Sequence, residues 1–253
     1  MSDAAGALQS WGQVKTYDGE VAVDSVSLTV PVGSLYGLVG PNGAGKTTFL
    51  SMATGLVRPT DGRVSIDGHD VWNDPVASRG RVGLLPDGPS LPEALTGARA
   101  LHYVGVLQGL DPGLAHERAG DLLRALSLAD AGDRAVSTYS AGMKKKIGLA
   151  AALIHSPKLL VLDEPLEAVD PVSALTIRGL LEGYVERGGT VIISSHSMSL
   201  IEQICSHVAI LDHGALLVAD TIDTVRGDSS LESALMTALG DQAPAASLPW
   251  LGQ

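Results

Sequence analysis

The sequence predicts an α/β fold that combines a parallel-sheet core, a small antiparallel β layer at its N-terminal side and an inserted helical subdomain. Residues 159–162 and 190–194 form short apolar runs, which are typical of parallel strands buried on both faces. Residues 21–30 instead alternate roughly between apolar and polar side chains, as in a half-buried antiparallel strand. From about residue 95 to 155 apolar residues recur at helical spacing, which places the helical subdomain at about 88–156.

Further segments complete the two expected sheets. Strands near 13–17 and 63–66 would join residues 21–30 in the antiparallel layer. Residues 34–39 are expected to form a core strand that leads, through a glycine-rich loop, into a helix over 48–54. Later in the chain, Asp212-His213-Gly214 separates two apolar runs, which predicts a hairpin.

The chain has 253 residues, of which 45% are hydrophobic, enough to bury a core without cross-links. We interpret residues 1–240 as one domain and expect the Ala- and Pro-rich residues 241–253 to be a mobile tail. Within the helical subdomain, Leu101, Val104 and Leu107 are expected to share one apolar face. The single cysteine cannot form an internal disulfide, which fits a reducing compartment.

The loop at residues 40–47 carries the strongest chemical signal in the chain. It matches G-x-x-x-x-G-K-[ST], the phosphate-binding P-loop, and it lies between a predicted strand and a predicted helix. Glycines let successive backbone N–H groups curl around an anion, and the following helix directs its positive dipole end to the same point. A glycine-rich turn with a chance Lys-Thr pair would not explain this context. The loop consists of Gly40, Pro41, Asn42, Gly43, Ala44, Gly45, Lys46 and Thr47. Its lysine would reach the β- and γ-phosphates, and its threonine hydroxyl would bind Mg²⁺.

Polar side chains follow the predicted core strands where each strand ends. Asp163 and Glu164 come directly after one strand, and His196 follows the next. Asp163 is placed to hold Mg²⁺ through water, and Glu164 to polarise an attacking water as a general base. His196 would contact the γ-phosphate and help to orient that water. Taken alone, an exposed acidic pair and a structural histidine would explain these residues as well, but the upstream P-loop favours the catalytic interpretation.

The charge of the chain argues against a nucleic-acid partner, because a net charge of −11 repels phosphate backbones. The one dense basic run, residues 144–146, consists of three lysines and is expected to be a solvated helix face. The N-terminus shows no targeting segment, and no window reaches the roughly 18 apolar residues that a membrane helix needs. We therefore expect a protein that does not enter a membrane by itself.

Together these motifs resemble the nucleotide-binding domain of ATP-binding cassette (ABC) proteins. The resemblance covers residues 12–220, and its motifs occur in the family's order with family-like spacing. The signature motif, here at residues 139–143, separates this family from other P-loop ATPases. The resemblance places the site on Tyr17 at the adenine-stacking position, Gly40 to Thr48 in the Walker A loop, Asp87 in the Q-loop near nucleotide and metal, Ser140 and Gly142 in the signature, Asp163 and Glu164 in Walker B, Asp170 in the D-loop, and His196 as the switch histidine.

The resemblance also implies a shared catalytic site. Two such domains, in a homo- or heterodimer, would pair head to tail around two ATP molecules and Mg²⁺. Ser140 and Gly142 of one domain would then cap the γ-phosphate that the P-loop of the other domain holds. ATP would close the dimer, and hydrolysis with Glu164 as base would release it.

Several residues depart from the family's pattern. Asp87 replaces the usual glutamine, which shortens the side chain and adds a negative charge near the phosphates. Ala141 and Met143 stand where the signature has glycine and glutamine, and Glu167 stands where the D-loop has serine or asparagine. Each change could slow hydrolysis or mark one half of an asymmetric pair. Since the predicted base is retained, we predict a competent ATPase.

One P-loop, one signature and no membrane span predict an ATPase subunit that drives a separate integral membrane permease. Residues 84–97 resemble the acidic Q-loop variant of stand-alone cassettes that serve drug, antibiotic or peptide exporters. A small apolar groove within residues 87–110 is expected to receive the permease, which would hold the chain at the cytoplasmic face of the cell membrane. The alternative is a soluble ABC ATPase that acts on ribosomes or DNA, against which the single cassette and the acidic charge count. A small-molecule P-loop kinase would leave the signature and the switch histidine unexplained.

Overall fold

The structure, a computed structural model, describes residues 6–88 and 91–239. Its centre is a sheet of six strands: β3 (Leu35–Val39), β6 (Val82–Leu85), β7 (Leu159–Leu162), β8 (Thr190–Ser195), β9 (His207–Asp212) and β10 (Ala215–Thr221). Their order across the sheet is β10-β9-β3-β8-β7-β6. All neighbours pair in parallel except β9 and β10, which form an antiparallel hairpin at one edge. The predicted parallel core and the predicted hairpin are therefore confirmed.

A second sheet forms the antiparallel layer. It consists of β1 (Gly6–Tyr17), β2 (Glu20–Pro31), β4 (Asp61–Ile66) and β5 (His69–Asp70) in the order β2-β1-β4-β5. The strand predicted near 13–17 begins much earlier, at Gly6. The sequence pattern did not reveal this start, because the pairing register of β1 with β2 shifts between Ser10 and Gln13. Gly12 lies in this shift with φ of 54°, so a β-bulge interrupts the alternation of side chains.

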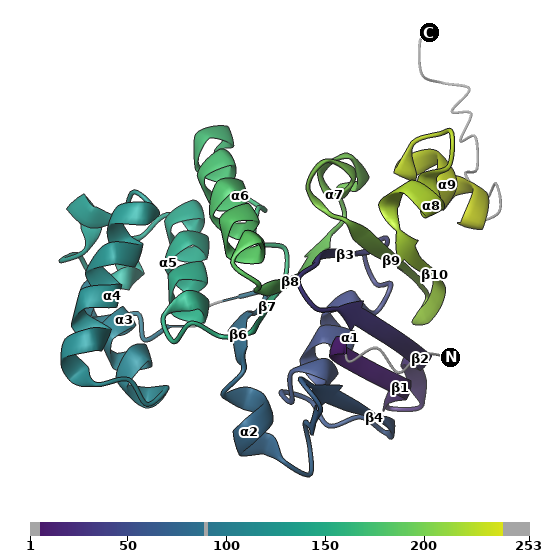
Figure 1. Cartoon of the computed structure of the whole chain (residues 1–253), viewed down its shortest axis with the longest axis horizontal. Coiled ribbons are helices and arrows are strands. Elements are labelled where there is room, and N and C mark those ends of the chain that lie inside the picture. Colours follow the sequence, from purple (N-terminus) through teal and green to yellow (C-terminus); the bar gives the residue numbers. More distant parts are fainter. Residues whose placement is uncertain (1–5, 89–90, 240–253) are drawn as a thin grey trace, which may run out of the picture.

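Helices flank both sheets. They are α1 (Lys46–Ala53), α2 (Pro75–Arg79), α3 (Gly97–Leu107), α4 (Pro112–Ala125), α5 (Ala141–Leu153), α6 (Pro171–Glu186), α7 (Met198–Ile204), α8 (Ile222–Arg226) and α9 (Leu231–Leu239), with short 3₁₀ turns η1 (Ala129–Ala131) and η2 (Val136–Thr138). Helices α3, α4 and α5 group at one end of the molecule, and the antiparallel layer lies beyond the central sheet from them (Figure 1). No helix of the described residues is both long enough and apolar enough to cross a bilayer.

One expected helix face is only partly confirmed. Leu101 is buried in α3, but Leu107 is 67% exposed. Two successive steps of three residues rotate a side chain by about 120° around the helix axis, so the last leucine leaves the packed face. The predicted tail at 241–253 lies outside the described residues.

The hydrophobic core has two parts, one on each face of the central sheet. Along β3, Leu35 and Val39 pack into a cluster that includes residues of α5, α6 and α7. Tyr36 and Leu38 point to the opposite face and pack with Phe49 of α1 and with the antiparallel layer. Burial on both faces explains why these strands are continuous apolar runs. Each fully buried large side chain contributes about 1.5–3 kcal/mol relative to exposure.

The parallel strands bring their carboxyl ends to one edge of the central sheet. The P-loop follows β3, Asp87 follows β6, Asp163 and Glu164 follow β7, and His196 follows β8. Ligands of open α/β sheets bind at this edge. The fold therefore assembles residues that are more than 100 positions apart in the chain.

Candidate nucleotide-binding site

The P-loop is held close to neighbouring backbone, which only glycine permits. A Cβ atom on Gly45 would lie 2.5 Å from the Ala22 carbonyl oxygen, and one on Gly40 would lie 2.1 Å from that of Leu211. Gly43 and Gly45 also have φ values of 82° and 94°, which side chains disfavour. The loop is thus fixed between β2, β9 and α1, and its curvature belongs to the fold itself.

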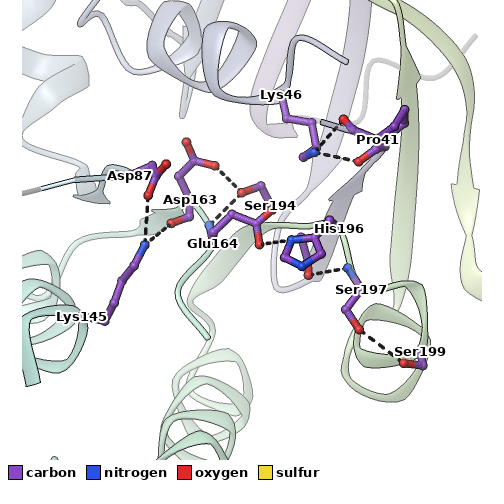
Figure 2. A network of polar contacts seen from close by, with 12 residues as sticks. Pro41, Lys46, Asp87, Lys145, Asp163, Glu164, Ser194, His196, Ser197 and Ser199 are labelled. Carbon is purple, nitrogen blue, oxygen red and sulfur yellow. Dashed lines mark hydrogen bonds and ion pairs between the residues drawn. The ribbon is translucent and has the colours of Figure 1, made fainter. Parts of the chain in front are cut away.

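Lys46 is folded into the concavity of this loop. Its Nζ atom donates to the carbonyl oxygens of Gly40 at 2.7 Å and Pro41 at 3.2 Å (Figure 2). Burial lowers the pKa of Lys46, while the nearby carboxylates of Glu164 and Asp163 oppose that shift. A buried ammonium that is held only by neutral carbonyls suits an anionic ligand such as a phosphate.

A cavity of about 510 Å³ opens above the loop. It is lined by residues from the P-loop and from three other strand ends: Ala22, Asn42, Gly43, Ala44, Gly45, Lys46, Thr47, Thr48, Asp87, Glu164, Glu167 and His196. The described residues hold no group of three or more His, Cys, Asp or Glu side chains that could bind a metal by themselves. Hydroxyl and carboxylate oxygens suit Mg²⁺, which keeps few protein ligands and takes the others from phosphates and water. The donor set therefore fits nucleotide with Mg²⁺.

Asp163 and Glu164 are positioned by a residue that the sequence did not single out. Ser194, at the end of β8, is fully buried; its hydroxyl donates to Oδ1 of Asp163 and accepts the backbone N–H of Glu164 at 2.9 Å (Figure 2). Glu164 has φ of 46°, a left-handed conformation that is uncommon for this residue type. One hydroxyl thus fixes both acidic residues. The available signal was a serine at the end of an otherwise apolar strand beside β7.

Glu164 and His196 face each other in the cavity. Nδ1 of His196 lies 3.2 Å from Oε2 of Glu164, whose side chain is 15% exposed (Figure 2). The backbone after the histidine is fixed by a hydrogen bond from Ser197 N–H to the Ser195 hydroxyl at 3.0 Å. A carboxylate that is oriented by an imidazole, beside a phosphate-binding loop, is an arrangement that can activate water.

Comparison with known proteins agrees with this geometry. The sequence pattern of the family described as ABC transporter matches residues 23–167. The chain belongs to the ABC transporter family. It is 38% identical to the daunorubicin/doxorubicin resistance ATP-binding protein DrrA of Streptomyces peucetius, over 90% of this chain and 68% of that protein. It is 34% identical to the linearmycin resistance ATP-binding protein LnrL of Bacillus subtilis, over 85% of this chain and 69% of that protein.

Solved structures of ABC proteins share the fold. The ATP-binding subunit of an ABC transporter superposes with a TM-score of 0.86 at 26% identity, over 92% of this chain and 99% of that one. A dimeric ATP-binding cassette bound to ADP and phosphate superposes with a TM-score of 0.79 at 22% identity, over 85% and 98% of the two chains. The predicted fold class is confirmed, and the chain is an ATPase of the ABC type.

In this ABC domain the lysine run is not a solvated face. Nζ of Lys145 lies 3.3 Å from Oδ1 of Asp87 and 3.4 Å from the backbone carbonyl oxygen of Asp163 (Figure 2). Lys146 is 8% exposed, and its Nζ lies 3.3 Å from the Ser173 hydroxyl. The prediction is wrong because the Lys145 ammonium reaches the end of β7 and the Lys146 ammonium reaches the start of α6.

Other residues predicted for the ABC site lie outside the cavity. Ser140 caps α5, with its hydroxyl accepting Met143 N–H at 3.3 Å, and Asp170 caps α6, with Oδ1 accepting Ser173 N–H at 3.0 Å. The hydrogen bonds from Ser173 lower the pKa of Asp170. Gly142 packs near the D-loop: a Cβ there would lie 3.1 Å from the Ala168 carbonyl oxygen. Tyr17 is 46% exposed, and Lys15 Nζ lies 4.8 Å from its ring centroid.

Proposed function

We propose that this chain is the ATP-hydrolysing subunit of an ABC exporter, and that two copies close around two ATP molecules to drive a separate integral membrane permease. The observation that carries the proposal is the division of the site. The phosphate-binding wall and the base lie in one cavity, whereas Ser140 and Gly142 lie at a helix end outside it. A second copy would supply the missing wall.

Within one copy, each side chain has a defined task. The P-loop N–H groups and Lys46 would hold the phosphates, and Tyr17 would stack on the adenine. Thr47, Asp163 and Asp87 would hold Mg²⁺, which when bound neutralises phosphate charge. Glu164 would take a proton from the attacking water. His196 would contact both that carboxylate and the γ-phosphate and hold them in position for the reaction.

Across the dimer, Ser140 and Gly142 of the second copy would face the γ-phosphate. The Ser140 hydroxyl and the free N–H groups at the start of α5 are donors with a positive dipole end, which suits an anion. Asp170 would lie at the same junction through the D-loop. Because one chain carries both walls, two copies would form two complete sites, so a homodimer is sufficient for the proposed function.

An apolar groove between α3, α5 and the end of α1 supports a permease-docking surface. The groove has a volume of about 370 Å³, and its apolar lining comes from Leu56, Val82, Leu84, Leu91, Val104, Ala151 and Ala152. Three of its lining residues fall within residues 87–110, where such a groove was expected. Leu56 is 60% exposed there. An unoccupied apolar surface of this kind fits a helix of a partner.

The cargo class is taken from the relatives. Their names describe resistance to daunorubicin, doxorubicin and linearmycin, which favours export of drug-like compounds over action on ribosomes or DNA. The acidic chain supports the same choice, because its charge disfavours nucleic acid. The subunit would then lie on the cytoplasmic face of the cell membrane, held there by the permease.

The test is recovery of the permease. Tagged chain is purified from detergent-solubilised membranes of cells that produce it, together with the variants Leu56→Glu in the groove and Val76→Glu outside it, where the side chain is 86% exposed. We expect one integral membrane protein in stoichiometric amount with the wild type and with V76E, and its loss with L56E. Recovery of ribosomes or nucleic acid in its place would reject the transporter assignment.

A further inference from the structure

We propose that Lys145 is a positioning residue that neutralises the acidic Q-loop residue Asp87 and ties helix α5 to the metal-binding strand end. The proposal rests on the proposed function, because it concerns the nucleotide cavity of that function. It also explains how this chain tolerates a carboxylate where its family resemblance leads one to expect an amide. The Lys145 ammonium joins three segments: the loop after β6, the end of β7 and the N-terminal half of α5.

The contacts of Lys145 differ from those of a solvent-facing lysine. Its side chain is 16% exposed, compared with 37% for Lys144 in the same helical turn and 68% for Lys158. Its ammonium lies 3.3 Å from the Asp87 carboxylate and 3.4 Å from the Asp163 carbonyl oxygen. Ordering a lysine in this way costs side-chain entropy, so a partly buried ammonium with two oxygen partners indicates a specific position.

The charges around the nucleotide cavity explain why a contact between Lys145 and Asp87 would favour nucleotide binding. Asp87, Glu164 and Glu167 all line the cavity, and Lys46 is its only cationic lining residue among the described positions. An uncompensated Asp87 would repel a triphosphate, and the effect is strong at the low effective dielectric near a protein surface. Paired with Lys145, Asp87 presents less negative charge to the nucleotide than an unpaired carboxylate would, although its side chain is 55% exposed.

Lys145 acts through Asp87 and not on the nucleotide directly. It does not line the nucleotide cavity; it lines a neighbouring cavity with Leu91, Val136 and Ile147. Asp87 borders both cavities. The carboxylate therefore has two competing partners, the ammonium on α5 and a metal ion beside the phosphates. Movement of Asp87 toward the metal would release the start of α5, which carries Ser140 and Gly142.

The experiment is a double-mutant cycle with the variants Lys145→Met, Asp87→Asn and the pair combined. Binding of a fluorescent ATP analogue to the purified chain is measured with excess EDTA and again with Mg²⁺. We expect K145M to weaken binding about fivefold in EDTA and less in Mg²⁺, because free Asp87 then contacts the metal. In EDTA, where Asp87 has no metal to bind, D87N should bind at least as tightly as the wild type, and the double variant should return to within about twofold of it. The deficit of K145M should shrink in 1 M salt, where screening acts within about 3 Å.

The controls separate charge from folding. Lys144→Met makes the same change one residue earlier, where the lysine pairs with Glu93 outside the nucleotide cavity, and should not alter binding. Lys145→Arg keeps the charge and should restore affinity. Equal weakening in K145M and in the double variant, or wild-type affinity in K145M, would overturn the proposal. Because these measurements use the isolated chain, failure to recover a permease would reject the transporter assignment and leave this result standing.

Discussion

Two regions of the molecule, the P-loop and the signature at the start of α5, differ in how many of their predicted contacts form within one chain. The P-loop wall is built from residues 40–48, adjoins three other strand ends and already binds its own lysine through carbonyl oxygens. The signature wall contains Ser140, whose hydroxyl caps its own helix. Ser140 does not line the nucleotide cavity. In the proposed function, affinity for the phosphates is therefore a property of one chain, whereas catalysis requires a second copy.

This difference has a physical origin in the elements that carry the walls. The P-loop connects a fully buried strand to helix α1, and the backbone of β2 and β9 lies so close to Gly45 and Gly40 that neither position has room for a side chain. The signature lies at the start of α5, beside the helical group of α3 and α4 and away from the antiparallel layer (Figure 1). The following predictions test this division, from the largest expected effect to the smallest.

Glu164→Gln should separate binding from turnover most strongly. Loss of the general base should lower kcat by at least about 100-fold, because proton transfer by a positioned side chain contributes 10²–10⁴-fold. Binding of ATP should be unchanged, since the P-loop wall is intact. Phosphate release and equilibrium binding measure the two effects. Glu182→Gln, on α6 and paired with Arg178, is the control and should keep full activity; unchanged turnover in E164Q would reject the assigned base.

Gly45→Ala should damage the P-loop wall itself. The added methyl would collide with the Ala22 carbonyl oxygen in a backbone with φ of 94°, so the loop must shift. We expect at least tenfold weaker ATP binding and a loss of about 1–3 kcal/mol in the free energy of unfolding. Gly188→Ala is a matched control, with φ of 89° but no atom near its Cβ. It should lose stability from the backbone strain alone and retain ATP binding; equal binding loss in both variants would contradict the role of close packing.

Ser194→Ala tests the hydroxyl that fixes both acidic residues. Removing it leaves the buried Asp163 carboxylate without that donor and frees the Glu164 backbone. We expect kcat to fall about tenfold and the free energy of unfolding to fall by about 1–3 kcal/mol. Ser78→Ala is equally buried and bonds only to carbonyls near its own helix, so it should lose stability without losing kcat. A normal kcat in S194A would show that Glu164 is held by other contacts.

The smallest effect concerns pH and the far end of α5. Burial lowers the pKa of His155, whose Nε2 lies 3.1 Å from the Val82 carbonyl oxygen. A folded-state pKa below the unfolded value of about 6.5 means that the unfolded chain binds more protons, so stability is full above that value and falls as pH decreases below it. The urea midpoint should decrease between pH 7 and pH 5.5, and by less in His155→Gln. An identical decrease in both proteins would exclude this histidine as the cause.

The sequence predicted the P-loop wall well because that wall is local. Glycine spacing, a lysine and a threonine within eight residues define the loop, and the fixed strand–helix context follows from adjacent residues. Asp163, Glu164 and His196 were also identifiable, since each directly follows an apolar run. The family and the fold class that these motifs predicted are confirmed.

Contacts between distant segments were not predictable in the same way. Ser194 gains its role only when β7 and β8 become neighbours, and nothing in its own segment indicates that pairing. The residues next to Lys145 in the sequence are those expected around a solvent-facing lysine. Its burial depends on where β6 and β7 end relative to α5. The early start of β1 was not predicted from the alternation of apolar and polar residues, because a bulge at Gly12 shifts the register.

The central claim, that two copies share each ATP site, has a direct test by complementation. Lys46→Ala disables the P-loop wall and keeps Ser140; Ser140→Asp keeps the helix cap but places a negative charge opposite the γ-phosphate. Ser140→Asn, a neutral cap, controls for the change in shape and should retain most turnover. Each of K46A and S140D should be inactive alone. An equal mixture should recover about a quarter of wild-type phosphate release, because half of the dimers are mixed and each has one complete site. A mixture as inactive as its two components would contradict the shared site.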